Sequence, residues 1–359
     1  MKEKINNSKF RATLILTIRS IFFGLAFGAI VLLLSGHDPI LAYEKLFMGI
    51  FSKPKYLCWV VIKSTPIILT GLSVAFAFRT GLFNIGAEGQ FMIGTLTATI
   101  LGVVLDLPPA IHIPIVVMGA MLAAGLFGGF AGWLKGTYGV NEVISTIMLN
   151  WIALYLANYF VYLPMLKNPG TESTFDIRES AKINFSWLET ITGPGVKNNW
   201  GFLIVIIGVI IISFYLFKTT KGFELRAVGY NKHAAKYAGI DMKRAIIRSM
   251  FIAGALAGLA GAVQVMGVSY HISKLSISEN YGFTGIAVSL LGSNSPVGVI
   301  FAGLMFGGMQ YGGAKMQFVG VPSEVINIIF GIIILSTTIT DMSWFSLKVK
   351  NKFIKQREV

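Results

Sequence analysis

Long apolar stretches recur along the whole chain and constrain its fold more than any other feature. An α-helix rises about 1.5 Å per residue, so about 20 apolar residues are needed to cross the hydrocarbon core of a bilayer. Nine stretches approach or exceed that length: Thr13–Leu34, Leu57–Phe78, Phe83–Leu105, Ile111–Leu134, Val143–Leu163, Phe202–Phe217, Ala245–Val268, Pro296–Gly313 and Val325–Thr340. A tenth, Gly282–Gly292, is apolar but short. The pattern predicts an all-α integral membrane protein with about ten transmembrane helices.

The composition favours the same class. Of the 359 residues, 54% are hydrophobic and 13% are charged, whereas soluble domains carry about 25% charged residues. A soluble fold of this length would lack the charges to cover its surface. Many of the 40 glycines lie within apolar runs, where they allow membrane helices to approach closely. The single cysteine, Cys58, excludes an intrachain disulfide and a cysteine cluster for metal.

The basic residues predict the orientation. With the N-terminus inside, the cytoplasmic segments would be 1–12, 79–82, 135–142, 218–244, 293–295 and 341–359. Together with Arg19 and Arg248 they hold 20 Lys and Arg residues, against nine in the outside loops. This bias is typical of cytoplasmic loops and accounts for the net charge of +14 without a nucleic-acid partner. Both termini inside require an even number of spans, which favours ten, with eight as the alternative.

We therefore expect one transmembrane domain over residues 1–359 in the plasma membrane. It would consist of a cytoplasmic N-terminus (1–12), a helix bundle (13–340) and a cytoplasmic tail (341–359). The bundle would carry a long outside loop (164–200) and a basic cytoplasmic loop (218–244). The first apolar run is longer than a signal-peptide core of about 7–15 residues, so we expect an anchor helix there.

The first candidate site is the segment 81–90, where glycines, two amides and an acid interrupt apolar sequence. An acid at the centre of a membrane helix costs about 2.5–3.5 kcal/mol, so Glu88 needs a partner, a water-filled cavity or an interfacial position. Asn84 and Gln90 carry amides that can bond a polar solute. The segment predicts a discontinuous helix beside a solute path; the alternative is that these residues connect helices without touching solute. Asn150, within the fifth apolar run, has the same two interpretations.

The second candidate site is the basic inner loop between residues 226 and 240. The stretch from Lys232 to Ala238 has helical propensity, and Gly229 and Gly239 bracket it as breaks would bracket one short helix. Such a helix on the cytoplasmic face suits mechanical coupling to another subunit. The alternative is an ordinary positive-inside loop that fixes topology or binds anionic lipid.

The motifs that would indicate chemistry within the chain are absent from the sequence. There is no GxxxxGK[ST] phosphate-binding loop and no HExxH metal motif. We therefore expect a transport subunit rather than an enzyme, with no cofactor of its own. Any ATP would be bound by another polypeptide.

Three motifs together carry a resemblance to a known family. They are GLFNIGAEGQFMIG at 81–94, RAVGYNKHAAKYAGI at 226–240 and GFTGIAVSLLGSNSPVG at 282–298. In order and spacing they resemble the bacterial permeases for nucleosides and simple sugars in the ATP-binding cassette (ABC) superfamily, which are related to the ribose and branched-chain amino-acid permeases. The chain resembles the longer of the two permeases in nucleoside systems.

The resemblance implies the importer fold, with about ten helices per subunit. The similar glycine-rich segments 83–87 and 283–287 predict a short or discontinuous helix in each half. It implies that the segment from Phe83 to Gln90 lies beside the translocation path; with Asn150, the expected path residues are Phe83, Asn84, Glu88, Gln90 and Asn150. It also implies that the loop forms a coupling helix seated in an ATPase. The residues expected there are Arg226, Gly229, Asn231, Ala234, Ala235, Tyr237, Ala238 and Gly239.

The resemblance also implies partners. These are a second, related permease, two cytoplasmic ATPase domains that bind ATP and Mg²⁺, and an extracytoplasmic solute-binding lipoprotein. The expected function is ATP-driven import of a small polar solute, above all a nucleoside. A simple-sugar permease is the first alternative. An ion-coupled secondary transporter is less favoured, because such proteins need buried ionisable residues and Glu88 is the one good acidic candidate.

Overall fold

The computed structural model describes residues 22–185, 187, 192–332 and 335–336, and it divides the chain into two compact units. Unit 2 comprises Lys53–Gly308, and unit 1 comprises Met1–Ser52 with Met309–Val359. Every regular element among the described residues is helical, apart from three isolated β-bridges. The all-α prediction is therefore confirmed.

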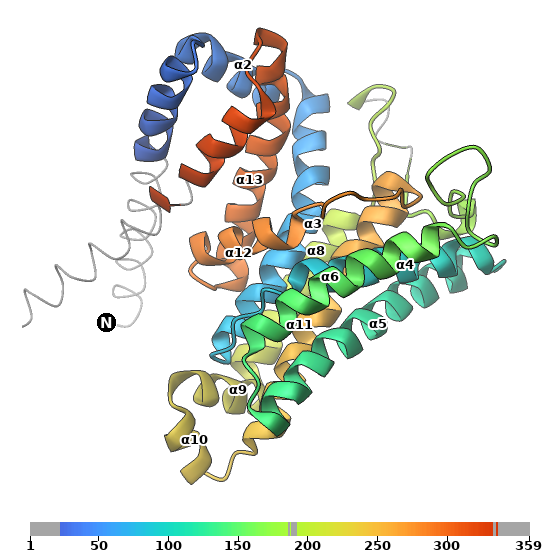
Figure 1. Cartoon of the computed structure of the whole chain (residues 1–359), viewed down its shortest axis with the longest axis vertical. Coiled ribbons are helices and arrows are strands. Elements are labelled where there is room, and N and C mark those ends of the chain that lie inside the picture. The colour runs from blue at the N-terminus through green and yellow to red at the C-terminus, as the bar shows by residue number, and fades with distance from the viewer. Residues whose placement is uncertain (1–21, 186, 188–191, 333–334, 337–359) are drawn as a thin grey trace, which may run out of the picture. The chain divides into compact units, whose positions relative to one another are not determined.

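Most helices belong to unit 2 (Figure 1). They are α3 (Pro54–Arg79), α4 (Ala87–Val104), α5 (Pro109–Tyr138), α6 (Glu142–Val161), η1 (Glu179–Ala181), α8 (Gly201–Lys218), α9 (Thr220–Tyr230), α10 (Lys232–Tyr237), α11 (Met242–Gln264) with the π-helical turn η2 (Val265–Ser269), and α12 (Tyr281–Leu291). α13 (Pro296–Met316) runs from unit 2 into unit 1.

Seven helices in the described part of the chain are long and apolar enough to cross a membrane. Three further apolar helices are shorter: Phe22–Leu34, Tyr281–Leu291 and Ser323–Ile332. The expected count of ten is reached only if these three also cross the bilayer, so ten is not confirmed. Parts of the first and last expected spans, 13–21, 333–334 and 337–340, lie outside the described residues, as do the expected cytoplasmic N-terminus 1–12 and tail 341–359.

The core of unit 2 is formed by α3, α4 and α11. These three helices bury most of their apolar windows, whereas α5, α6 and α8 bury about a quarter of theirs. The outer helices expose large apolar side chains such as Leu126, Tyr155 and Ile210. In water this arrangement would be unfavourable, because each exposed apolar side chain would lose the free energy gained by burial. The surface is that of a protein embedded in lipid.

Glycines set the spacing between α4, α5 and α11, which run side by side in Figure 1. A Cβ atom added at Gly94 of α4 would lie 2.4 Å from the Gly258 carbonyl oxygen of α11. One added at Gly254 of α11 would lie 2.4 Å from the Ala124 carbonyl oxygen of α5. Such backbone-to-backbone contact requires small residues. The three helices therefore form one closely packed block.

Polar segments lie at opposite ends of this block. The described part of the loop 164–200 packs at one end, where Arg178 N donates to Gly102 O near the end of α4 and Ser180 contacts His112 near the start of α5. α9 packs at the other end, where its Gly229 meets the last residue of α3, Arg79. The sequence predicts that these two segments lie on opposite sides of the membrane, and this stays a prediction.

Unit 1 contains the helix Phe22–Leu34, α2 (Pro39–Phe51), the 3₁₀ turn η3 (Gln317–Val319) and the helix Ser323–Ile332. Asp38 starts α2, because its side chain accepts hydrogen bonds from the N–H groups of Ile40 and Leu41. The Tyr43 hydroxyl donates to Leu25 O at 2.7 Å and so connects α2 to the first helix. Sequence reasoning treated this region as an outside loop and missed α2.

Candidate solute path and coupling segment

The first candidate segment contains a buried interruption between two helices. α3 ends at Arg79 and α4 begins at Ala87, and residues 80–86, hereafter the break, are not helical. Thr80, Leu82 and Asn84 are nevertheless fully buried or nearly so. Non-helical backbone at membrane depth is tolerated only inside protein or beside water. The break satisfies this condition because neighbouring helices enclose it.

The two amides of the segment bond each other. Asn84 Nδ2 donates to Gln90 Oε1 at 2.9 Å, and Gln90 Nε2 donates to Asn84 Oδ1 at 3.2 Å. Both side chains are buried. Phe83 is partly exposed and stacks on Phe78 with ring centroids 5.1 Å apart. In this conformation the amides close the break against α4 and use part of their bonding capacity within the protein.

Glu88, in the first turn of α4 directly after the break, connects α4 to the start of the short helix α12, 192 or more residues away in sequence. One carboxylate oxygen accepts from Asn280 N–H at 2.8 Å and the other accepts from Gly282 N–H at 2.5 Å. These amides lie at the start of α12, where the first N–H groups have no partner within the helix and the helix dipole favours an anion. Glu88 is thus an N-terminal cap supplied by another helix, and it is completely buried.

Asn150 of α6 holds the other side of the break. Its Oδ1 accepts from Gly89 N–H at 2.8 Å, and its Nδ2 donates to Ile85 O at 3.1 Å. Gly89 N–H is among the first amides of α4, so Asn150 caps α4 as Glu88 caps α12. The structure therefore brings the four polar path candidates to one junction of α3, α4, α6 and α12. All four bond protein groups there, which gives each a structural role independent of any contact with solute.

The second candidate segment, residues 226–240, forms the end of α9 and the short helix α10. Asn231 begins α10, because its Oδ1 accepts from the N–H groups of His233 and Ala234 at 3.0 and 3.1 Å. Gly239 ends it with φ +79°, and Ile240 N–H donates to Ala235 O, which is the Schellman pattern that favours glycine. A short helix ending at Gly239 was predicted and is present.

The role expected of Gly229 as the first break is wrong. Gly229 lies inside α9, and Asn231 provides the break with extended backbone. Glycine is needed at 229 because a Cβ would lie 2.3 Å from the Arg79 carbonyl oxygen. The sequence pattern was identified correctly, but the glycine serves close helix packing and not chain reversal.

Most of α10 faces away from the rest of unit 2. Ala235 is its one buried residue, and Tyr237 is 94% exposed. Ala234, Ala238 and Lys236 are also exposed. A six-residue helix without a core face gains little stability from its own protein. The exposed surface of this capped helix consists of basic residues, one alanine and Tyr237.

Comparison with known proteins identifies the family of the chain. Residues 56–338 match the family model for the permease component of branched-chain amino acid transport systems. The chain belongs to this family. It is 43% identical over 323 residues to the guanosine ABC transporter permease NupP of Bacillus subtilis, covering 90% of this chain and 92% of the relative. It is 38% identical to the nucleoside ABC transporter permease NupB of Lactococcus lactis, covering 91% of each.

A third relative transports a different solute. The glucose ABC transporter permease TsgB13 of Haloferax volcanii is 31% identical over 89% of this chain and 85% of its own length. The family resemblance inferred from the three motifs is therefore confirmed, and the chain is a multi-pass membrane permease component.

Sequence reasoning missed further polar residues of the permease near the capped start of α12. Tyr281 is buried against Phe91, with ring centroids 5.0 Å apart, and the Gln264 side chain interacts with it. Glu279 lies in the preceding linker and keeps solvent contact, although desolvation by the surrounding protein raises the pKa of its carboxyl and Lys63 opposes that shift. The sequence feature that could have indicated these residues is the amide of Gln264, which interrupts an apolar run. Among the described residues no cluster of His, Cys, Asp or Glu could hold a metal ion.

Proposed function

We propose that the chain is the membrane-spanning permease subunit of an ATP-driven importer whose solute is a nucleoside. The observation that carries this proposal is the 43% identity to a guanosine permease across nine-tenths of both chains. The 38% identity to a nucleoside permease over a similar length supports the same solute class.

The proposal assigns ATP hydrolysis to partners. Two cytoplasmic ATPase domains bind ATP and Mg²⁺, a second, related permease completes the membrane part, and an extracytoplasmic lipoprotein delivers the solute. The N- and C-termini and the segment 226–240 are cytoplasmic, which agrees with the excess of Lys and Arg in those segments. α10 is the coupling helix, with Tyr237 and its exposed neighbours Lys236 and Ala238 in contact with the ATPase.

Contacts within unit 2 support a route from the coupling helix to the membrane core. Movement of α10 reaches α9 through Asn231, and α9 rests on the end of α3 through Gly229. Arg79, at the end of α3, donates to Asn294 O after α12 at 2.8 Å. Glu88 then connects α4 to the start of α12. The break and α12 thus move together when the ATPases close.

The solute path in this proposal runs beside the break. Phe83 offers a partly exposed aromatic face, and Asn84 and Gln90 offer amide groups that can exchange their mutual bonds for bonds to a nucleoside. Glu88 and Asn150 position the two helix starts. Weak contacts are sufficient, because the binding protein supplies the affinity and alternating access requires release.

Two alternatives remain as outcomes of the test. The 31% identity to a glucose permease supports a simple-sugar permease less strongly than the nucleoside relatives support a nucleoside permease. An ion-coupled transporter would need a carboxylate free to exchange protons or sodium, and Glu88 already accepts two backbone N–H groups.

The test is uptake of radiolabelled guanosine, uridine and ribose in cells that carry or lack this gene together with its partner genes. We expect gene-dependent uptake of a nucleoside that an ATPase-inactive partner abolishes. Ribose uptake without nucleoside uptake would select the sugar alternative. Uptake by the purified permease without any ATPase would refute the proposal.

A further inference from the structure

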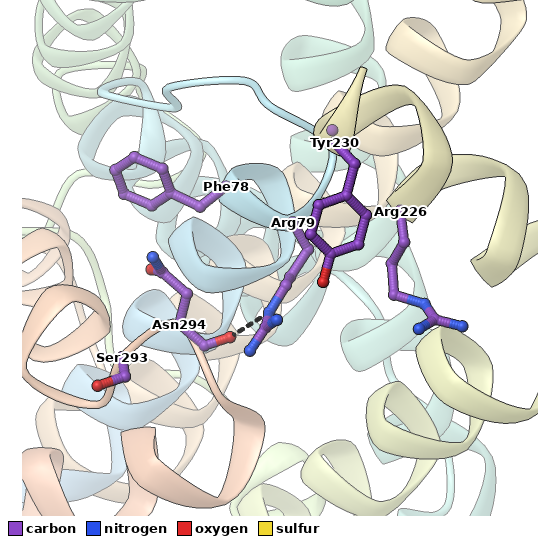
Figure 2. A pocket seen from close by; sticks show the side chains of 7 residues that line it. Phe78, Arg79, Arg226, Tyr230, Ser293 and Asn294 are labelled. Atoms are coloured by element: carbon purple, nitrogen blue, oxygen red, sulfur yellow. Dashed lines mark hydrogen bonds between the residues drawn. The ribbon is translucent and has the colours of Figure 1, made fainter. Parts of the chain in front are cut away.

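Two arginines without acidic partners line a pocket at the α9 end of unit 2. The pocket lies where α3, α9 and the turn between α12 and α13 meet, and its volume is about 200 Å³. Arg79 comes from α3 and Arg226 from α9, and Tyr230, Ser293 and Asn294 line the same opening (Figure 2). We call it the arginine pocket.

The guanidinium groups are incompletely bonded. Arg79 Nε donates to Asn294 O at 2.8 Å, while its two terminal nitrogens have no partner among the described residues. Arg226 makes no hydrogen bond or ion pair within the described part of the chain, and its Nε is buried without an acceptor. A buried donor that lacks a partner is unfavourable and uncommon in native proteins. An acceptor from outside this chain would resolve it.

The nearby acid is already engaged. Glu224 lies two residues before Arg226, but its carboxylate oxygens face Lys221 at 2.7 Å and Arg248 at 3.9 Å. Acidic compensation for the pocket is therefore lacking among the described residues. The positive charge of the pocket is free to attract an anion.

One aromatic ring contacts both cations. The guanidinium carbons of Arg79 and Arg226 lie 5.9 and 5.2 Å from the centroid of the Phe217 ring. Contact with a ring face is favourable for a cation, but it supplies no acceptor in the guanidinium plane. The N–H groups therefore keep their capacity for an anion, and the two cations line one pocket without a counter-ion among the described residues.

The third side of the pocket is a constrained turn. Ser293 and Asn294 both have φ of +52°, a conformation uncommon for residues other than glycine. Ser289 Oγ donates to Asn294 Oδ1 at 2.6 Å, which fixes the Asn294 side chain and leaves its NH₂ group available. The turn thus adds neutral polar groups beside the two cations.

We propose that the arginine pocket binds a phosphoryl group. Guanidinium groups bind phosphate through paired N–H donors. The double negative charge of a phosphate balances two guanidinium groups, whereas a single carboxylate balances only one. The group comes either from a soluble phosphate compound or from the headgroup of an anionic phospholipid. The bound group bridges α3, α9 and the α12–α13 turn, so it stabilises this arrangement of the three elements. A group that stabilises one arrangement should slow transport, and this consequence rests on the proposed function. The binding of the phosphoryl group does not depend on that function.

The test uses the complete transporter, purified in dodecyl maltoside and phosphate-free buffer. The thermal unfolding midpoint is measured during titration with inorganic phosphate, AMP or phosphatidylglycerol. We expect one of these probes to raise the midpoint of the wild type and Arg226→Gln to weaken its apparent Kd at least ten-fold. Arg226→Lys keeps the charge but not the planar fork and should be intermediate.

The matched control is Arg244→Gln, which removes one positive charge from an exposed arginine that already pairs with Asp241 at 3.1 Å. It should keep the wild-type response. Because Arg226 makes no hydrogen bond or ion pair within the described residues and loses only its contact with the Phe217 ring, Arg226→Gln should fold about as stably as the wild type without any probe. A response to phosphate or AMP identifies a soluble ligand, and a response to phosphatidylglycerol alone identifies a lipid.

The proposal is overturned if no probe raises the wild-type midpoint, or if Arg226→Gln responds as the wild type does. It is also overturned if Arg226→Gln loses the ATPase during purification while no probe has an effect, because the pocket would then receive an acidic residue of that partner. Failure of nucleoside uptake with phosphate binding intact would refute the proposed function and leave this site standing.

Discussion

Replacement of Glu88 by Gln tests whether the carboxylate holds α4 and α12 together. The substitution keeps the shape of the side chain and one acceptor oxygen, but it places an NH₂ group against one of two backbone N–H donors, those of Asn280 and Gly282. A hydrogen bond to a charged group contributes about 1.5–3 kcal/mol, and the charge at a helix start adds about 0.3–1 kcal/mol. We expect Glu88→Gln to lower the free energy of unfolding by about 2–4 kcal/mol.

The assay is denaturant or thermal unfolding of the purified transporter, compared with nucleoside uptake by the same variant. The control is Glu279→Gln, in the linker just before α12; this carboxyl is exposed and makes no hydrogen bond or ion pair among the described residues. A surface change of this kind costs at most about 0.5 kcal/mol. We expect Glu88→Gln to lower the maximal uptake rate without changing KM. Wild-type stability combined with an altered KM would show that Glu88 serves the solute and would refute the capping argument.

Three further substitutions test the other contacts. Asn150→Ala leaves the Gly89 N–H and an opposing carbonyl without partners, so it should lower stability by about 2–4 kcal/mol in the same unfolding assay; an unchanged midpoint would argue against the second cap. Gly229→Ala forces α9 away from α3 and should abolish uptake while membrane insertion persists, whereas Gly331→Ala, where nothing lies within 4 Å, should have no effect on uptake. Tyr237→Ala should leave stability within about 0.5 kcal/mol but reduce co-purification of the ATPase; retention of both the ATPase and full uptake would count against α10 as the coupling helix.

The long helices and the end of α10 could be predicted, because they depend on residues close together in the sequence. The apolar runs predicted the long helices, because lipid requires a continuous apolar length. Asn231 and Gly239 delimit α10 through hydrogen bonds to residues within five positions. α2 was missed because Glu44 and Lys45 interrupt its apolar pattern, while its start depends on Pro39 and the capping side chain of Asp38.

Features that depend on distant contacts could not be predicted. The sequence marked Glu88 as a residue in need of a partner, but that partner is backbone 192 and 194 residues away. Asn150 was left with two interpretations for the same reason, since its partners lie on another helix. Gly229 carried a signal for a turn, and only the position of Arg79 reveals that it is a packing residue.

The contact of α4, α5 and α11 through bare backbone limits where a conformational change can occur. A single added carbon at Gly94 or Gly254 would collide with a neighbouring carbonyl. We therefore expect these tightly packed helices to move as one rigid body. They form a stator, a part that keeps its shape through the cycle. Opening and closing must then take place around its rim, at junctions made by exchangeable hydrogen bonds.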